Sequence, residues 1–130
     1  MTKKELSQLY WLNKEIEKDK KTLAKLEESA TDTAVKISGI PHASGISDKT
    51  AIAAEIADIR ALIEARTAMS IIEYNRLNRY IAGVDDSLIR QILTLRYING
   101  LEWRQVAETI GGGNTEDSVR MAHSRYLRNH

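Results

Sequence analysis

The C-terminal part of the chain carries an apolar pattern that predicts two short helices joined by a glycine-rich turn. Apolar residues recur at the spacing of one helical face on both sides of Gly111-Gly112-Gly113: Trp103, Val106, Ala107 and Ile110 before it, and Val119, Ala122 and Tyr126 after it. Two helices joined in this way pack at a steep angle and leave the outer face of the second helix exposed. The pattern therefore predicts a helix-turn-helix, in which the second helix is shaped to enter the major groove of DNA.

A further helix is expected just before this pair. Asp85-Asp86-Ser87 supplies side-chain oxygens that cap a helix N-terminus, and acidic residues there also suit the helix dipole. This helix is predicted from Leu88 to about Ile98, with its inward side chains at Leu88, Ile92, Leu95 and, at the margin, Ile89. The next helix should run from about Glu102 to Ile110, and Thr115 is placed as the N-cap of the last one.

The N-terminal part shows heptad spacing over residues of about 5–37. Two rows of mostly apolar or small residues follow this spacing: Leu9, Ile16, Leu23, Ala30 and Ile37 in one, and Leu12, Asp19, Leu26 and Thr33 in the other. Charges of alternating sign lie between them, which is typical of a helix buried along one seam and solvated elsewhere. Such a helix would be roughly 50 Å long. Gly39 and Pro41 are expected to end it.

A second long helix is predicted over about 48–82, after a Gly- and Ser-rich connector at residues 38–47. Ser47-Asp48 is its expected N-cap and Gly83 its stop signal. One face carries Ile52, Ile56, Ile59, Ile63, Ser70, Tyr74, Leu77 and Ile81. We therefore expect an all-α fold in which a long antiparallel, coiled-coil-like helical hairpin at residues 1–84 precedes a three-helix helix-turn-helix module at residues 85–130.

A second apolar edge on this helix comprises Leu62, Met69 and Ile72. One partner helix cannot cover both this edge and the main stripe. Either the edge packs on the C-terminal helices, or it mediates self-association of the protein. A homo-oligomer, with a dimer favoured, would suit DNA binding, because one helix-turn-helix reads only a few base pairs and a dimer sets two half-sites about 34 Å apart or a multiple of it.

Composition and motifs exclude several classes of function. The chain has no cysteine, which rules out disulfides and thiolate metal sites, and nothing places its three histidines together. The run Gly111-Gly112-Gly113 lacks the Lys-Ser/Thr of a phosphate loop and follows a predicted helix rather than a strand. No Ser, His and Asp set has a recognisable spacing. We therefore expect a non-enzyme with no catalytic residue, metal or cofactor, and interpret His123 as a half-buried helix residue.

No apolar run approaches the roughly 18 residues that span a bilayer, and the first residues lack the apolar core of a signal peptide. No membrane association is expected, and the absence of cysteine suits a reducing cytoplasm.

The net charge is only +1, and residues 85–130 balance six arginines against six acidic residues. Nucleic-acid binding would therefore depend on local geometry rather than on an overall positive field.

The buried side of the last helix is expected to carry Val119, Ala122 and Tyr126. The residues on the opposite side then face outward. The predicted DNA contacts lie there and around the turn: Arg104, Asn114, Thr115, Asp117, Arg120, Met121, Ser124, Arg125 and Arg128. Arg120 lies one turn into the helix, where recognition helices meet base edges. Arg104 and either Arg125 or Arg128 are expected to contact phosphates. Neutral groups at the turn, from Asn114 and Thr115, would add further contacts.

The string LRYINGLEWRQVA, residues 95–107, resembles the start of the helix-turn-helix in region 4 of bacterial sigma factors. More narrowly, RYINGLEWRQVAETIGGGNTEDSVRMAHSRYL, preceded by the helical hairpin and the connector PHASGISDK, resembles a family of small phage and prophage proteins of Gram-positive bacteria. These carry a sigma-region-4-like domain and mostly have no assigned function, and late-gene regulators of the ArpU and RinA type share the module. The resemblance covers nearly the whole chain.

The resemblance implies double-stranded DNA as the partner and a bacterial host cytoplasm as the location. It also places a DNA-contacting arginine at Arg120 and an acidic contact residue at Asp117, which could accept a hydrogen bond from cytosine N4. Two features differ from sigma region 4. The glycine turn is about two residues longer, and Glu116 stands where sigma factors usually carry arginine.

Three functions compete. The favoured hypothesis is a phage-encoded transcriptional regulator that binds DNA through the C-terminal helix-turn-helix and oligomerises through the N-terminal hairpin. An alternative is an adaptor protein that binds host RNA polymerase. A further alternative is a packaging protein like the small terminase subunits, which also combine helix-turn-helix and coiled elements and would form ring oligomers.

Overall fold

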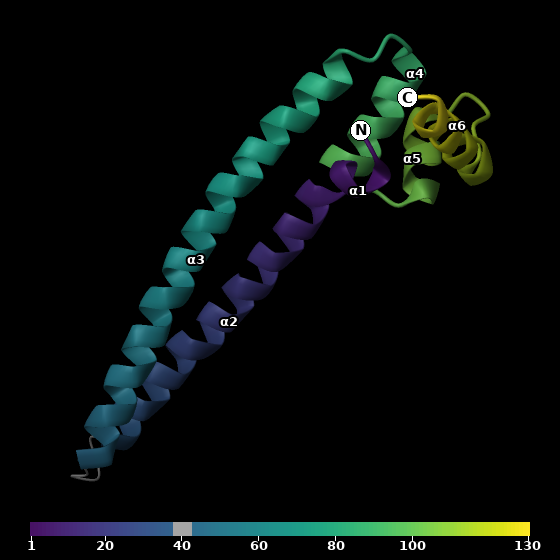
Figure 1. Ribbon diagram of the computed structural model, residues 1–130. Helices are drawn as coiled ribbons and strands as arrows, with labels where there is room; N and C mark the ends of the chain where they lie inside the picture. Colours follow the sequence, from purple (N-terminus) through teal and green to yellow (C-terminus); the bar gives the residue numbers. More distant parts are fainter. Residues whose placement is uncertain (38–42) are drawn as a thin grey trace. The chain divides into compact units, whose positions relative to one another are not determined.

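The computed structural model describes the backbone of residues 1–37 and 43–130, and the side chains of residues 1–31 and 49–130. Throughout these residues the chain is helical with short turns and has no strand (Figure 1), so the all-α prediction is confirmed. The elements are α1 (Lys3–Leu6), α2 (Gln8–Ile37), α3 (Ala43–Ala82), α4 (Ser87–Leu93), the π-helical turn η1 (Thr94–Ile98), α5 (Trp103–Ile110) and α6 (Glu116–Asn129).

Two helix starts differ from the prediction. The backbone is already helical from Ala43, so Ser47-Asp48 lies within α3 and the N-cap expected there is wrong; the rest of the predicted connector, residues 38–42, lies outside the described residues. The first helix is interrupted at Ser7, whose ψ of −6° departs from helical geometry and separates α1 from α2. The Ser7 hydroxyl donates to the Lys3 carbonyl at 2.8 Å, in addition to the backbone bond from the Ser7 amide to the same oxygen at 3.0 Å.

The chain divides into two compact units, a hairpin unit of residues 13–69 and a head unit of residues 1–12 and 70–130. This division differs from the predicted boundary after residue 84. The beginning of α2 and the last part of α3 belong with the C-terminal helices, because their apolar side chains contribute to the core of the head unit.

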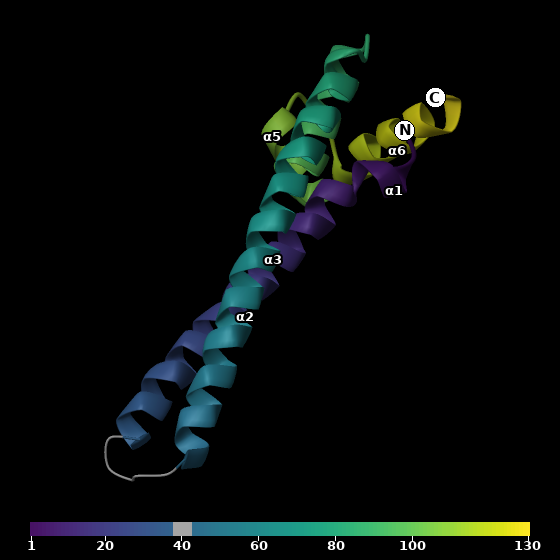
Figure 2. The ribbon, with the colours of Figure 1, turned by 60° about the vertical axis from the view of Figure 1, so that its left-hand side comes forward.

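In the hairpin unit α2 and α3 run in opposite directions, as Figures 1 and 2 show. Ion pairs fix this orientation: Arg60 contacts Glu27 at 2.9 Å, and Arg66 contacts Asp19 at 2.5 Å and Glu15 at 3.1 Å. The predicted seam is present, with Ile16 and Asp19 buried, and with half-buried residues at Leu23, Leu26, Ala30, Ile52, Ile56, Ile59 and Ile63. The polar residue in the heptad row, Asp19, is therefore buried against an arginine of the facing helix.

The head unit has one apolar core, to which every helix of the unit contributes. Its buried members are Leu6, Leu9, Leu77, Ile81, Val84, Ile89, Ile92, Leu93, Tyr97, Val106, Ala107 and Val119. Two predicted inward residues are instead exposed, Leu88 at 37% and Tyr74 at 47%. The exposure of Leu88 follows from the N-cap of α4. Asp86 accepts from the Leu88 and Ile89 amides, and a helix that begins at this cap places Ile89, Ile92 and Leu93 on its inner face.

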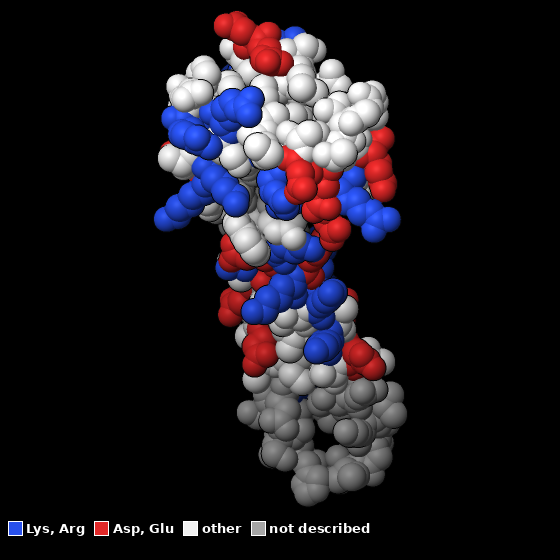
Figure 3. Space-filling view, turned by 90° about the vertical axis from the view of Figure 1, so that its right-hand side faces the viewer, with Lys and Arg blue, Asp and Glu red and all other residues white. Residues whose placement is uncertain are grey.

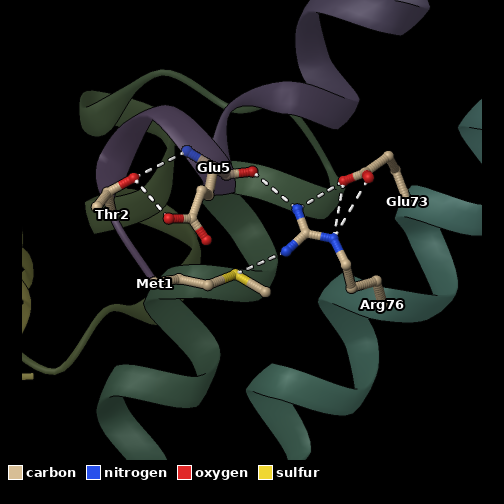
Figure 4. Close-up of polar contacts among 5 residues, drawn as sticks. All are labelled: Met1, Thr2, Glu5, Glu73 and Arg76. Carbon is tan, nitrogen blue, oxygen red and sulfur yellow. Dashed lines mark hydrogen bonds and ion pairs between the residues drawn. The ribbon is translucent and has the colours of Figure 1, made fainter.

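A polar contact holds α1 against α3 within the head unit. The Arg76 guanidinium lies among the Glu73 carboxylate at 2.7 Å, the Glu5 carbonyl at 3.3 Å and the sulfur of Met1 at 3.7 Å (Figure 4). The hydrogen bond with Glu73 is the main reason why the pKa of Arg76 is raised, against an opposing effect of burial. This contact positions the N-terminal turn, which Thr2 caps by accepting from the Glu5 amide at 3.2 Å.

The second apolar edge of α3 is exposed. Leu62 is 37%, Met69 52% and Ile72 63% accessible. Across the described ranges, no helix combines the length and the hydropathy needed to cross a bilayer.

Candidate nucleic-acid interface

The first helix of the predicted motif, α5, is set by its N-terminal turn and its buried face. The Glu102 amide donates to Oε1 of Gln105 at 2.9 Å, which satisfies a backbone group that the helix itself leaves unpaired. Val106 and Ala107 face the core. The helix ends where the Gly111 amide donates to the Ala107 carbonyl at 2.9 Å. The predicted limits of this helix, about Glu102 to Ile110, are confirmed within one residue.

The turn between the helices requires its glycines. Gly111, Gly112 and Gly113 have φ values of 66°, 61° and 80°, a left-handed region that costs side-chain-bearing residues conformational energy. Asn114 closes the turn, because its Nδ2 donates to the Gly111 carbonyl at 2.8 Å and its backbone amide donates to the same oxygen at 3.1 Å. The Asn114 side chain, predicted as a DNA contact, is half-buried and bonded within the turn.

The second helix, α6, begins at a reciprocal cap. Thr115 Oγ1 accepts from the Ser118 amide at 3.1 Å, and Ser118 Oγ accepts from the Thr115 amide at 2.8 Å. This confirms the predicted N-cap. The Thr115 hydroxyl is thus engaged in holding the start of α6, although the residue itself is exposed at the turn.

α6 separates into an inner and an outer face. Val119 and His123 are buried, and Ala122 and Tyr126 are half-buried. The predicted outward residues are all exposed: Asp117, Arg120, Met121, Ser124, Arg125 and Arg128. All but the first of these line one open hollow of about 360 Å³. Figure 3 looks onto the side that carries α6 and shows Lys and Arg side chains gathered along one margin, with acidic side chains beside them.

The arginines on this surface differ in their ion pairs. Arg120 is paired with Asp117, and its Nη1 also lies 3.7 Å from Glu116. Arg104 on α5 is paired with Glu108 at 3.3 Å. In the described part of the chain, Arg125 and Arg128 have no carboxylate partner. The structure thus presents one arginine oriented by acids near the start of α6 and two uncompensated arginines further along it.

A buried polar contact sets the rotation of α6. Nε2 of His123 lies 2.5 Å from the Tyr97 hydroxyl, and the imidazole lies edge-on to the Trp103 ring with centroids 4.7 Å apart. Burial, followed by the charges of Lys3 and Arg96, lowers the pKa of His123 to about 4, and burial raises the pKa of Tyr97 to about 12. The imidazole is therefore neutral at physiological pH.

His123 was expected to be half-buried, and it is buried at 3% accessibility. Its spacing provides the signal that could have placed it inside, because it follows buried Val119 by four residues and so shares its helical face. Its hydrogen-bond partner on η1 is 26 residues away and cannot be found from local spacing.

Within the ranges that the structure describes, no group of three His, Asp or Glu side chains is arranged to hold a metal ion. Searches against protein-family models, curated proteins and solved structures found no significant match to the chain. The outer face of α6 is therefore interpreted from its own geometry and charge.

Proposed function

We propose that this chain is a DNA-binding transcriptional regulator that lays α6 in the major groove. The observation that carries the proposal is the hollow on α6, where Arg120, Met121, Ser124, Arg125 and Arg128 lie together on the exposed face. A single helix fits the major groove, which is about 12 Å wide. Arginine is the side chain that most often reads guanine edges and also forks onto phosphates.

In this proposal the residues of the face divide between base and phosphate contacts. Arg120 lies near the N-terminus of α6, the end of a recognition helix that meets base edges. Asp117, its ion-pair partner, would accept from cytosine N4. Arg125, Arg128 and, on α5, Arg104 would contact phosphates, which fix the register of the helix on the duplex.

The proposed regulator acts as a dimer, and the exposed α3 edge of Leu62, Met69 and Ile72 is the surface that would be buried between two copies. Apolar side chains grouped on an exposed helix face favour association, because burying them removes apolar area from water. The resemblance to sigma-region-4-like phage proteins supports a phage-encoded regulator that works in the cytoplasm of a bacterial host.

Selection of bound fragments from random and phage genomic DNA, repeated at several salt concentrations, tests this function. A regulator should enrich a defined sequence, and the enrichment should persist as salt weakens attraction to phosphate alone. Arg79 is an exposed arginine on α3, so Arg79→Ala is the matched control for variants in which an arginine of the α6 face is replaced, and it should enrich the same sequence as the wild type. A pool without sequence enrichment at any salt concentration would contradict the proposal.

One observation favours a second candidate, an adaptor that binds host RNA polymerase. Glu116 and Asp117 compensate the charge of Arg120, so part of the α6 face is already neutralised before any ligand binds. An adaptor should co-purify with the polymerase after nuclease treatment and at high salt, and should not bind a duplex alone. Retention of the polymerase together with an absence of duplex binding would favour this role over the regulator.

A further inference from the structure

A second hollow, of about 310 Å³, lies in the head unit where α1, the beginning of α2 and η1 meet. Its lining combines aromatic and charged side chains, among them Lys3, Tyr10, Trp11, Arg96 and Glu102. None of its residues lines the hollow on α6. This second site is therefore separate from the proposed DNA-binding face.

The aromatic side of the hollow is accessible to a partner. Trp11 is 59% accessible and Tyr10 37%, and their rings meet edge-on with centroids 5.1 Å apart. The core does not need Trp11, because Leu9 and Leu12 on the same helix supply the buried contacts. Trp, Tyr and Arg are the residues most enriched in the energetic centres of protein interfaces.

The charges at this site are unbalanced in favour of cations. Lys3 has no ion-pair partner among the described residues, and Glu102 is the acidic residue of the lining. Arg96 is held in place, because its Nη1 donates to the Leu101 carbonyl at 2.9 Å and its guanidinium carbon lies 4.8 Å from the centroid of the Trp103 ring. Because the Arg96 guanidinium is held in one position, a carboxylate of a ligand can accept hydrogen bonds from it without first ordering the arginine side chain.

Arg96 reaches this hollow from an irregular helical turn. In η1 the Asn99 amide bonds to the Thr94 carbonyl five residues earlier, at 3.0 Å, which is the π-helical pattern. Such turns are uncommon and occur frequently at functional sites. The residues of η1 thus serve two purposes, since Tyr97 contacts the core histidine while Arg96 lines the hollow.

We infer that this hollow binds an acidic peptide segment of a partner protein, with one aromatic side chain against Trp11 and Tyr10 and carboxylates near Lys3 and Arg96. The volume lies at the lower end of the range for ligand pockets, which suits one large side chain rather than an extended ligand. Single-stranded nucleic acid is the other ligand that could stack on Trp11, and the experiment below includes an oligonucleotide as an outcome that would contradict a peptide site.

Three synthetic peptides labelled with fluorescein test this inference on the full chain by fluorescence anisotropy. The probe is fluoresceinyl-EEDWDEE-amide, with the label on the N-terminal amine. Its controls are fluoresceinyl-QQNWNQQ-amide, which removes the peptide charge, and fluoresceinyl-EEDADEE-amide, which removes the aromatic anchor. Saturable binding of the probe, at least fivefold tighter than that of either control, is expected. No saturable binding at millimolar peptide, or equal binding of all three, would overturn the inference.

Matched variants locate the binding. Trp11→Ala and Lys3→Ala should each weaken binding of the probe by about tenfold. Tyr74→Ala, an exposed aromatic on α3, and Lys4→Ala, an exposed neighbour outside the lining, should leave the affinity within about twofold of the wild type. Circular dichroism shows whether the variants keep their helices, and Trp11→Tyr provides a conservative replacement that should retain most of the binding. Equal losses in the control variants, or a thymidine oligonucleotide that binds more tightly than the probe through Trp11, would contradict a peptide site.

Discussion

Nε2 of His123 on α6 and the hydroxyl of Tyr97 on η1 lie 2.5 Å apart in the interior of the head unit. This bond ties the proposed recognition helix to the helix that precedes the motif. Nδ1 of the same imidazole is buried without a hydrogen-bond partner, so protonation of the ring would place an uncompensated charge in the core. The fold therefore requires neutral His123, and this requirement links stability to pH.

The free energy of unfolding should fall as the pH is lowered from about 6.5 to about 4, because the unfolded chain binds a proton in this range and the folded chain does not. The pKa of His123 drops from 6.5 to about 4 on folding, so the loss is at most about 3 kcal/mol and is complete below pH 4. Urea unfolding at a series of pH values measures it. His123→Gln should remove this component, and an identical pH profile for the variant and the wild type would contradict the interpretation.

Gly113→Ala should destabilise the protein by about 1–2 kcal/mol, the usual cost of the left-handed conformation for a residue with a side chain. The cost is conformational, because an added Cβ would meet nothing within 4 Å while φ is 80°. Gly83→Ala is the matched control: its φ is not in the left-handed region and the new Cβ would make an ordinary 3.5 Å contact. Urea unfolding compares the two, and an equal loss in both variants would rule out backbone strain as the cause.

Arg66→Ala should destabilise the hairpin unit more than Arg60→Ala does. Removal of Arg66 leaves Asp19, 7% accessible, as a buried carboxylate without its cation, whereas the partner of Arg60 is exposed Glu27. The double variant Asp19→Leu, Arg66→Leu replaces the whole pair by apolar residues and is expected to be neutral or stabilising. Thermal unfolding followed by circular dichroism ranks the three variants. A larger loss for Arg60→Ala than for Arg66→Ala would show that the buried pair is not the stronger constraint.

Arg120→Ala should weaken binding to the selected duplex by about 1–3 kcal/mol for each half-site and relax the preference at one base position in each. Its helix should remain intact, because Thr115 and Ser118 cap α6 without it. Binding curves on the selected site and on single-base variants of that site measure both effects. An unchanged base preference would remove Arg120 from the proposed readout.

The sequence predicted the helices and their caps well where the signal is local. Apolar spacing and the capping chemistry of Asp86 and Thr115 were sufficient for the C-terminal helices, and the exposed face of α6 followed from its buried residues. The interruption at Ser7 has no signal in the apolar spacing, and the start of α3 at Ala43 lies upstream of residues that favour a cap. Spacing rules do not resolve such local departures.

Contacts between residues that are distant in the chain could not be predicted from the sequence. The bond between Tyr97 and His123, the pairing of Asp19 with Arg66 and the clustering of Trp11 with Arg96 each join residues far apart in the chain. The sequence predicted which residues lie on the exposed face of α6. It did not predict that the Asn114 side chain closes the glycine turn by a hydrogen bond to the Gly111 carbonyl. A local pattern identifies which face of a helix is apolar, but it does not identify the partner that covers the face.

The central claim is that the outer face of α6 lies on duplex DNA, and the salt dependence of binding tests it most directly. The logarithm of the affinity should fall linearly with the logarithm of the salt concentration, and each lost phosphate contact should reduce the slope by about 1. The double variant Arg125→Ala, Arg128→Ala removes two contacts from each protomer, so the dimer should bind the selected duplex with a slope about 4 smaller than that of the wild type, while Arg79→Ala should keep the wild-type slope. An unchanged slope in the double variant, or no measurable duplex binding by the wild type at low salt, would contradict the account.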